Sequence, residues 1–140
     1  MASASGLHRG AYVLIESKNP EVILMGTGSE LQLCVAAFEK LEQQGVRARV
    51  VSMPSWEIFE EQDEAYKQSV LPASIPARVS VEAGSTLAWW KYLGPDGSAI
   101  GRDDFGASAP AKDLFKHFGF TPEHVVEAAL GVLERTKARV

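Results

Sequence analysis

The sequence is short of three things that would define its class: cysteine, positive charge and long apolar runs. Cys34 is the single cysteine among 140 residues, so the chain forms no internal disulfide and no cysteine-rich zinc cluster, which favours a reducing compartment. The formal net charge is −4 and the lysines and arginines are scattered, so we expect no nucleic-acid partner. No apolar run approaches the roughly 20 residues that cross a bilayer, so we expect no membrane partner.

The remaining composition is typical of a globular domain. Hydrophobic residues make up 46% of the chain and charged residues 23%, so a chain of this length can bury one core without disulfides or metal. The chain begins with the small residues MASAS, and we interpret residues 1–9 as a linker or an expression remnant that lacks the apolar core of a secretory signal. Residues 10–140 are expected to form one domain.

Strand-like and helix-like segments alternate along this domain. Short β-branched and apolar runs predict strands at residues 12–16, 22–25, 46–53, 77–82 and 98–101. Helical periodicity predicts helices at residues 29–44, 63–70, 86–93, 110–118 and from 122 almost to the end. The alternation predicts a three-layer α/β/α sandwich built on a mostly parallel sheet.

Three residues carry predictions about where the helices begin and end. Ser29 suits the N-cap of the first helix, with Gln32 completing a capping box, and Gly45 suits its C-terminal stop. Thr121 suits the N-cap of the last helix, because Pro122 then occupies the first helical position.

The loop from Gly26 to Ser29 is the first candidate binding site. A glycine turn that enters a helix offers free N–H groups to an anion, here the backbone of Gly28 and Ser29 and the side chains of Thr27 and Ser29. The alternative is an ordinary tight turn before a self-capped helix. Leu31 stands where the third glycine of a dinucleotide-binding motif would be, and this favours the ordinary turn.

A second helix entrance and one acid are further candidates. Ser108 precedes the predicted helix at residue 110, and Arg102 and Lys112 could support an anion there, although a structural loop is the favoured interpretation. Glu82 ends a predicted strand at the edge where doubly wound sheets bind ligands. Glu82 could equally bind a loop N–H group or face another domain.

The other conspicuous residues are expected to be structural. Cys34 lies among apolar helix positions and is assigned to the core. The adjacent Trp89 and Trp90 point in different directions around a helix, so we expect one of them to face a neighbouring domain or a second protomer. The three histidines have no metal-binding spacing, and we predict no catalytic, cofactor-binding or metal-binding residue in the chain.

Five blocks of sequence together resemble the C-terminal domain of transketolases of the bacterial and plastid type. They are GAYVLIE, VILMGTGSELQLCVAAFEKLEQQGVRARVVSMPS, QDEAYKQSVLP, ARVSVEAGS and IGRDDFGASAPAKDLFKHFGFTPEHVV. Related domains occur in pyruvate dehydrogenase β-type subunits and deoxyxylulose phosphate synthases, but VVSMPS and FGASAP favour transketolase. The resemblance covers residues 10–140 and implies a five-stranded mixed sheet with one antiparallel edge strand, for which residues 12–16 are the candidate.

The resemblance also implies a function. Transketolases transfer a two-carbon ketol unit between sugar phosphates in the pentose phosphate pathway and the Calvin cycle, using thiamine diphosphate with Mg²⁺ or Ca²⁺. Their cofactor site lies between the first two domains, and its GDG…N motif, activating glutamate and paired histidines are not found in this sequence. We therefore expect a chain that holds no cofactor and is inactive alone.

The expected role is to pack against the other transketolase domains and the second protomer of a homodimer, in the cytoplasm or the plastid stroma. One alternative is a regulatory module that binds a phosphorylated metabolite at the helix entrance from Gly26 to Ser29. The other is a free-standing enzyme that uses Glu82 or Cys34, although no nucleophile, base and orienting group can be assembled from the sequence.

Overall fold

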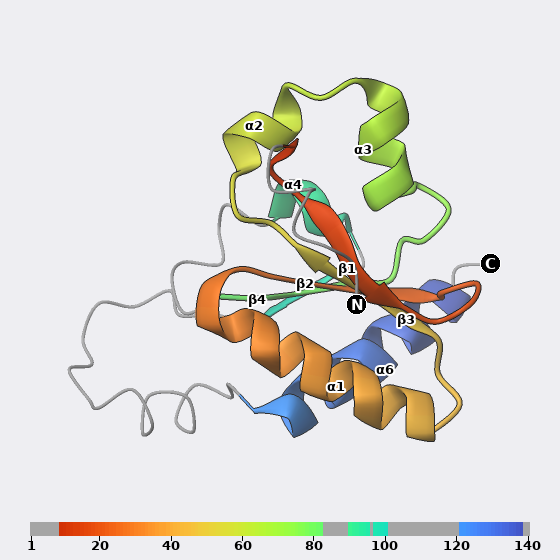
Figure 1. Cartoon of the computed structure of the whole chain (residues 1–140). Helices are drawn as coiled ribbons and strands as arrows, with labels where there is room; N and C mark the ends of the chain where they lie inside the picture. Colours follow the sequence, from red (N-terminus) through yellow and green to blue (C-terminus); the bar gives the residue numbers. More distant parts are fainter. Residues whose placement is uncertain (1–8, 83–89, 96, 101–120, 139–140) are drawn as a thin grey trace.

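Parallel strands make up most of the sheet, as the alternation of strands and helices predicts. The computed structural model describes residues 9–82, 90–95, 97–100 and 121–138. In this part of the chain the strand order is β1-β3-β2-β4-β5 (Figure 1). The strands are β1 Tyr12–Glu16, β2 Val22–Gly26, β3 Ala48–Ser52, β4 Arg78–Val81 and β5 Ser98–Ile100.

The one antiparallel pair lies at the edge formed by β1. β1 pairs antiparallel with β3, while β3, β2, β4 and β5 pair with one another in parallel. A bulge between Val13 and Ile15 interrupts the register of β1. The five-stranded mixed sheet and its antiparallel edge strand at residues 12–16 are therefore confirmed.

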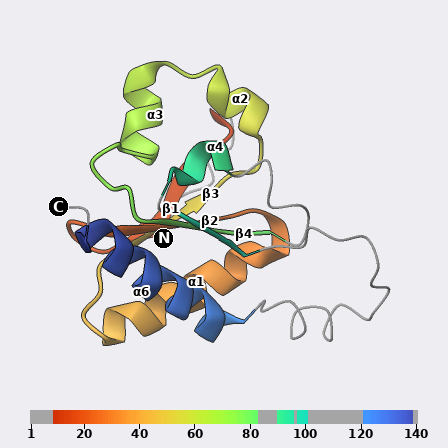
Figure 2. The ribbon, with the colours of Figure 1, turned by 180° about the vertical axis from the view of Figure 1, so that it is seen from behind.

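Helices cover both faces of the sheet. Figures 1 and 2 show α1 and α6 on one face and the short helices α2, α3 and α4 on the other. The helices are α1 Leu31–Gln43, α2 Trp56–Glu60, α3 Glu64–Val70, α4 Trp90–Leu93 and α6 Pro122–Ala138, and a 3-10 helix, η2 Gly28–Glu30, precedes α1. None of the described helices has the length and apolar character that crossing a membrane requires.

Alternate side chains of the central strands belong to two separate hydrophobic cores, one on each face of the sheet. On β2, Val22 and Leu24 belong to the core against α1 and α6, while Ile23 and Met25 belong to the core against α2, α3 and α4. All five β2 residues are buried, which explains why this strand is apolar throughout rather than alternating. Cys34 is fully buried in the first core, which confirms its assignment.

The C-terminal end of α1 confirms the prediction for Gly45. Gly45 has a φ of +79°, which glycine adopts without strain. Its N–H donates to the carbonyl of Glu42 over 3.0 Å, and the N–H of Val46 donates to the carbonyl of Leu41 over 2.9 Å. These two bonds close the helix in the pattern typical of a glycine C-cap.

The predicted start of α1 is wrong. Ser29 was expected to be the N-cap, but it lies inside η2, and α1 begins at Leu31 with Glu30 in the N-cap position. Glu30 has helical dihedral angles and makes no capping bond with its side chain. Gly28, with a φ of +61°, turns the chain directly into the 3-10 turn, so Ser29 follows the start of helical structure instead of preceding it.

The ends of the other helices agree with the sequence in most places. Asp63 accepts a hydrogen bond from the Tyr66 N–H over 2.8 Å and caps α3, and Thr121 accepts one from the His124 N–H over 3.2 Å at the start of α6. The sequence missed the five-residue α2, which Ser55 caps. The predicted helix at residues 110–118 lies outside the described residues.

Candidate functional site

A groove lies at the edge where the parallel strands β2, β3 and β4 end. It has a volume of about 500 Å³ and is lined by the residues that follow these strands. In α/β sheets this edge is where ligands usually bind. The groove brings together Thr27 and Glu82, which the sequence had singled out separately. Its lining residues are Thr27, Met53, Pro54, Ser55, Trp56, Glu57 and Glu82.

The charged groups of this groove are acidic. Glu57 and Glu82 contribute carboxylates, and no lysine or arginine belongs to its described lining. No second carboxylate near Glu82 could be identified from the sequence, and the fold brings Glu57, at the start of α2, into the same groove as Glu82. The hydroxyl of Ser55 already accepts the Ile58 N–H, at 3.4 Å.

The chain's own acid, Glu30, lies beside the helix entrance from Gly26 to Ser29. Glu30 is buried, with 8% of its surface exposed, and its Oε2 atom lies 3.6 Å from where a Cβ on Gly28 would be. A carboxylate in this position already meets the positive end of α1, so it competes with any bound anion. The described geometry therefore gives the anion-binding hypothesis no support.

Burial dominates the chemistry of Cys34, which lies beside this entrance. Its Sγ is 3.1 Å from where a Cβ on Gly26 would be. Burial, with a smaller contribution from the nearby charge of Glu30, raises the pKa of the Cys34 thiol to about 12. The thiol is therefore neutral and unreactive at physiological pH, which excludes it as a nucleophile.

Several candidates from the sequence lie outside the described residues. They include Ser108 with its neighbours Arg102 and Lys112, and also Trp89. The backbone of Trp90 begins α4, but its side chain is not among those described. The predicted interface role of the two tryptophans stays a prediction.

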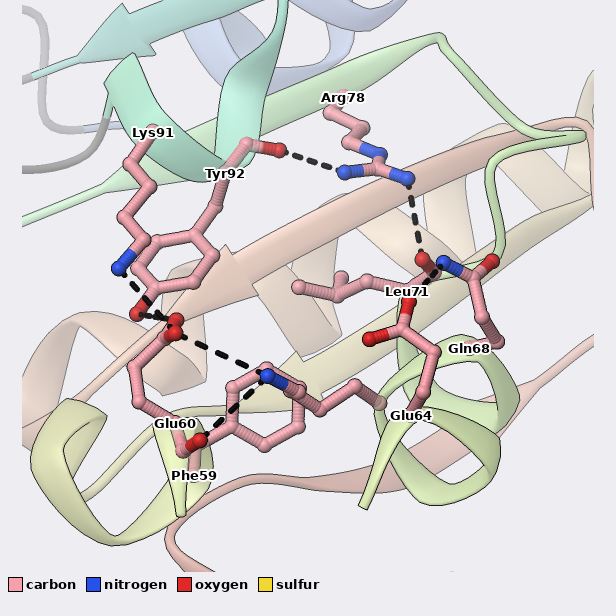
Figure 3. A pocket seen from close by; sticks show the side chains of 9 residues that line it. Phe59, Glu60, Glu64, Gln68, Leu71, Arg78, Lys91 and Tyr92 are labelled. Carbon is pink, nitrogen blue, oxygen red and sulfur yellow. Dashed lines mark hydrogen bonds and ion pairs between the residues drawn. The ribbon is translucent and has the colours of Figure 1, made fainter. Parts of the chain in front are cut away.

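A second cavity, which the sequence did not predict, lies among α2, α3, α4 and the start of β4. Figure 3 shows it, and its volume is about 190 Å³. Its charged side chains come from four separate elements and mix acids with bases. The lining residues are Phe59, Glu60, Glu64, Lys67, Gln68, Leu71, Arg78, Lys91 and Tyr92.

Glu60 is the centre of this cavity's polar network. Its carboxylate accepts the Tyr92 hydroxyl over 2.7 Å and lies 3.2 Å from the Lys91 ammonium and 3.9 Å from that of Lys67 (Figure 3). The Tyr92 hydrogen bond, more than the two lysines, holds the pKa of Glu60 below its usual value. Burial raises the pKa of Tyr92, and Glu60 adds to this effect. The network ties α4 to α2.

Arg78 forms the other half of the network. Its guanidinium donates to the carbonyls of Ile75 at 3.0 Å and Tyr92 at 2.7 Å. It also donates to the carbonyls of Leu71 at 3.2 Å and Pro72 at 2.9 Å. Four of its five N–H groups are thereby used within the chain, and burial lowers its pKa. The cavity is therefore a junction that fixes the short helices to the sheet.

The described residues hold no cluster of three or more histidine, cysteine, aspartate or glutamate side chains that could bind a metal ion. The sequence missed the Arg78 and Glu60 network because backbone carbonyls carry no sequence signature. The available signal was a charged residue that opens an otherwise buried strand, since Arg78 precedes Val79 in this way.

Comparison with known proteins identifies the fold and the family. Residues 10–121 match the family described as Transketolase-like TK C-terminal domain. The chain is 49% identical to the chloroplastic transketolase of Zea mays over 91% of its own length, and 52% identical to transketolase 1 of Escherichia coli over 92%.

A solved transketolase from Pichia stipitis, a mutant in complex with xylulose 5-phosphate, superimposes with a TM-score of 0.88 at 41% identity over 98% of this chain. The chain spans about a fifth of each of these relatives, 19% of the Zea mays protein and 20% of the other two. The match to the family extends over most of the sequence, and the chain belongs to the transketolase C-terminal domain family.

Proposed function

We propose that this chain serves as the C-terminal domain of a transketolase, an enzyme that transfers a two-carbon ketol unit between sugar phosphates. The observation that carries the proposal is the identity of about 50% to curated transketolases over more than nine-tenths of the chain. The relative from Pichia stipitis that was solved with xylulose 5-phosphate supports a sugar phosphate as the substrate class. The relatives from a chloroplast and from a bacterium support a plastid or cytoplasmic location.

The proposed role of the chain within the enzyme is structural. In the whole enzyme, thiamine diphosphate with Mg²⁺ or Ca²⁺ would supply an electron sink for the ketol carbanion. The described residues do not fit that cofactor, because they hold no cluster of three or more side chains that could bind its metal ion, and the described lining of the sheet-edge groove offers no lysine or arginine to a diphosphate. Around the second cavity, Glu60 is bound by Tyr92 and two lysines, and Arg78 is bound by backbone carbonyls, as packing groups are. We therefore assign no catalytic step to the chain, and propose that it supports the cofactor-binding domains and the homodimer.

A domain exchange tests this proposal. Transketolase 1 of Escherichia coli would be prepared in three forms: intact, without the segment that this chain matches, and with this chain in place of that segment. Ketol transfer from xylulose 5-phosphate to ribose 5-phosphate would be measured with thiamine diphosphate and Mg²⁺, and the chain alone would be assayed beside them.

We expect the chimera to be active, and both the shortened enzyme and the chain alone to be inactive or nearly so. Turnover by the chain alone would contradict a structural role. A chimera that folds and binds thiamine diphosphate but transfers no ketol unit would contradict the assignment to transketolase.

A further inference from the structure

The start of α2 presents an unusual surface next to the sheet-edge groove. Ile58 is 39% exposed, which is high for a large apolar side chain in the described part of this chain. Pro54 and Glu57 beside it are also exposed, and Trp56 lines the groove between them. We call Pro54, Trp56, Glu57 and Ile58 the α2 surface. A single exposed isoleucine is ordinary, but here its neighbours in sequence, Pro54, Trp56 and Glu57, line a groove.

The N-terminal end of the described chain lies against this surface. The carbonyl of Gly10 accepts the Ser55 N–H over 3.0 Å. A Cβ on Gly10 would overlap the carbonyl oxygen of Ser55 and the nitrogen of Phe59, so the two backbones touch with no side chain between them. In Figure 1 the red start of the described chain accordingly lies beside α2. Any domain joined ahead of Arg9 is therefore tethered next to the α2 surface.

The charge of the surface indicates what kind of partner would bind there. Glu57 is exposed and forms no ion pair within the described part of the chain. A partner surface that offers apolar side chains to Ile58 and a lysine or arginine to Glu57 would complement both features.

We propose that the α2 surface is where this domain docks on the preceding, cofactor-binding part of a transketolase polypeptide. The inference rests on the proposed function, and the size of the matched relatives agrees with it, because about four-fifths of their length lies outside the match. The tether at Gly10 keeps the preceding domain at a high local concentration, so a small mixed apolar and charged contact suffices.

Cysteine labelling tests the proposal cleanly, because the native Cys34 is buried and does not react. Ile58→Cys would be introduced into the chain alone and into the chimera with Escherichia coli transketolase 1. The rate of alkylation of this position would be followed by peptide mass spectrometry. Glu42→Cys is the matched control, because Glu42 is exposed on α1, on the opposite face of the sheet.

We expect Ile58→Cys to react at least about tenfold more slowly in an active chimera than in the chain alone, as for a side chain at the centre of an interface. The control should react at the same rate in both. Equal rates for Ile58→Cys in an active chimera would overturn the docking surface and leave the proposed function intact.

Two further results are informative. A chimera with the native sequence that folds and binds thiamine diphosphate but transfers no ketol unit would overturn the proposed function itself. Protection of Ile58→Cys in the chain alone that grows with protein concentration would overturn the proposal in favour of a second copy of this chain as the occupant.

Discussion

Replacing Arg78 by methionine should destabilise the domain strongly. Methionine keeps the apolar stem of the side chain and removes the four hydrogen bonds that the guanidinium donates to carbonyls. Two of these carbonyls belong to the buried residues Leu71 and Tyr92. Leaving a buried acceptor unsatisfied costs about 1–3 kcal/mol, while the other two carbonyls can turn to water.

The two unsatisfied carbonyls together should lower the free energy of unfolding by roughly 3 kcal/mol, because removing Arg78 also removes the free energy spent on burying its charge. A loss of this size is a large share of the roughly 5–15 kcal/mol that stabilises an ordinary domain. At about 3 °C for each kcal/mol in a chain of this length, the melting temperature should fall by about 10 °C.

Urea denaturation followed by circular dichroism would measure the change in the free energy of unfolding. Arg47→Met is the matched control, because the Arg47 side chain is 54% exposed, and both its ion pair with Glu21, at 3.8 Å, and its hydrogen bond to the Asn19 carbonyl, at 2.7 Å, lie at the surface. This control should cost less than about 1 kcal/mol. Arg78→Lys keeps the charge but reaches fewer carbonyls, so its cost should be intermediate. If Arg78→Met changed the free energy of unfolding by less than about 0.5 kcal/mol, the role assigned to Arg78 would be refuted.

Three other predictions concern glycine, thiol and carboxyl groups. Gly45→Ala should lower the free energy of unfolding by about 1 kcal/mol through its positive φ alone, because nothing lies within 4 Å of the new methyl group. Gly10→Ala should lower it by at least about 3 kcal/mol, because its φ is also positive and the new methyl group would overlap the backbone. Equal melting temperatures for the two variants would contradict this. The Cys34 thiol, with a pKa raised from 9.0 to about 12, stabilises the fold fully below pH 9, and this contribution should fall by up to about 1.4 kcal/mol per pH unit between pH 9 and 12. Urea titrations should therefore show that the free energy of unfolding falls less between pH 8 and pH 10 in Cys34→Ala than in the native chain. Tyr92→Phe should raise the lowered pKa of Glu60 towards its usual 4.5, and an NMR titration that leaves that pKa unchanged would exclude the hydrogen bond as its cause. The lowered pKa of Glu60 stabilises the fold above pH 4.5, and this stabilisation is lost as the pH falls below that value. Tyr92→Phe should therefore reduce the difference in the free energy of unfolding between pH 7 and pH 3.

The strands could be predicted from the sequence because burial leaves a direct mark on it. The run at residues 22–25 is apolar throughout since both faces of β2 are covered, and the run at residues 12–16 was correctly taken as an edge strand from its family resemblance. Gly45 marked the end of α1 because few other residues accept its backbone angles. Burial patterns and backbone requirements of this kind can be predicted from the sequence without a structure.

The start of α1 was misread because two local signals competed. Ser29 has the chemistry of an N-cap, but Gly28 allows a tighter turn that begins helical structure before it. The five-residue α2 was missed because a helix this short has too few positions to show a period. Its cap, Ser55, was read as a break after a strand.

The two sites differ in how far the sequence revealed them. Thr27 and Glu82 were singled out separately from the sequence, and the fold brings them into one groove because the parallel strands before them end at the same edge. The network around Arg78 could not be found in this way, because it joins a guanidinium to backbone carbonyls, and every residue has a carbonyl. Glu60 and Tyr92 are 32 positions apart, and only the packing of α2 against α4 brings them into contact.

The pairing of β1 with β3 has a consequence for the order of events during synthesis. Among the described strands β1 is made before the others, but its neighbour in the described sheet is β3, and Tyr12 meets Ser52 about 40 residues later. At the usual 5–20 residues per second, a nascent β1 stays unpaired for about 2–8 s. β1 can thus pair with its neighbour only after β3 has emerged. Slow codons between residues 16 and 48 would lengthen the time in which this strand can pair with other nascent chains.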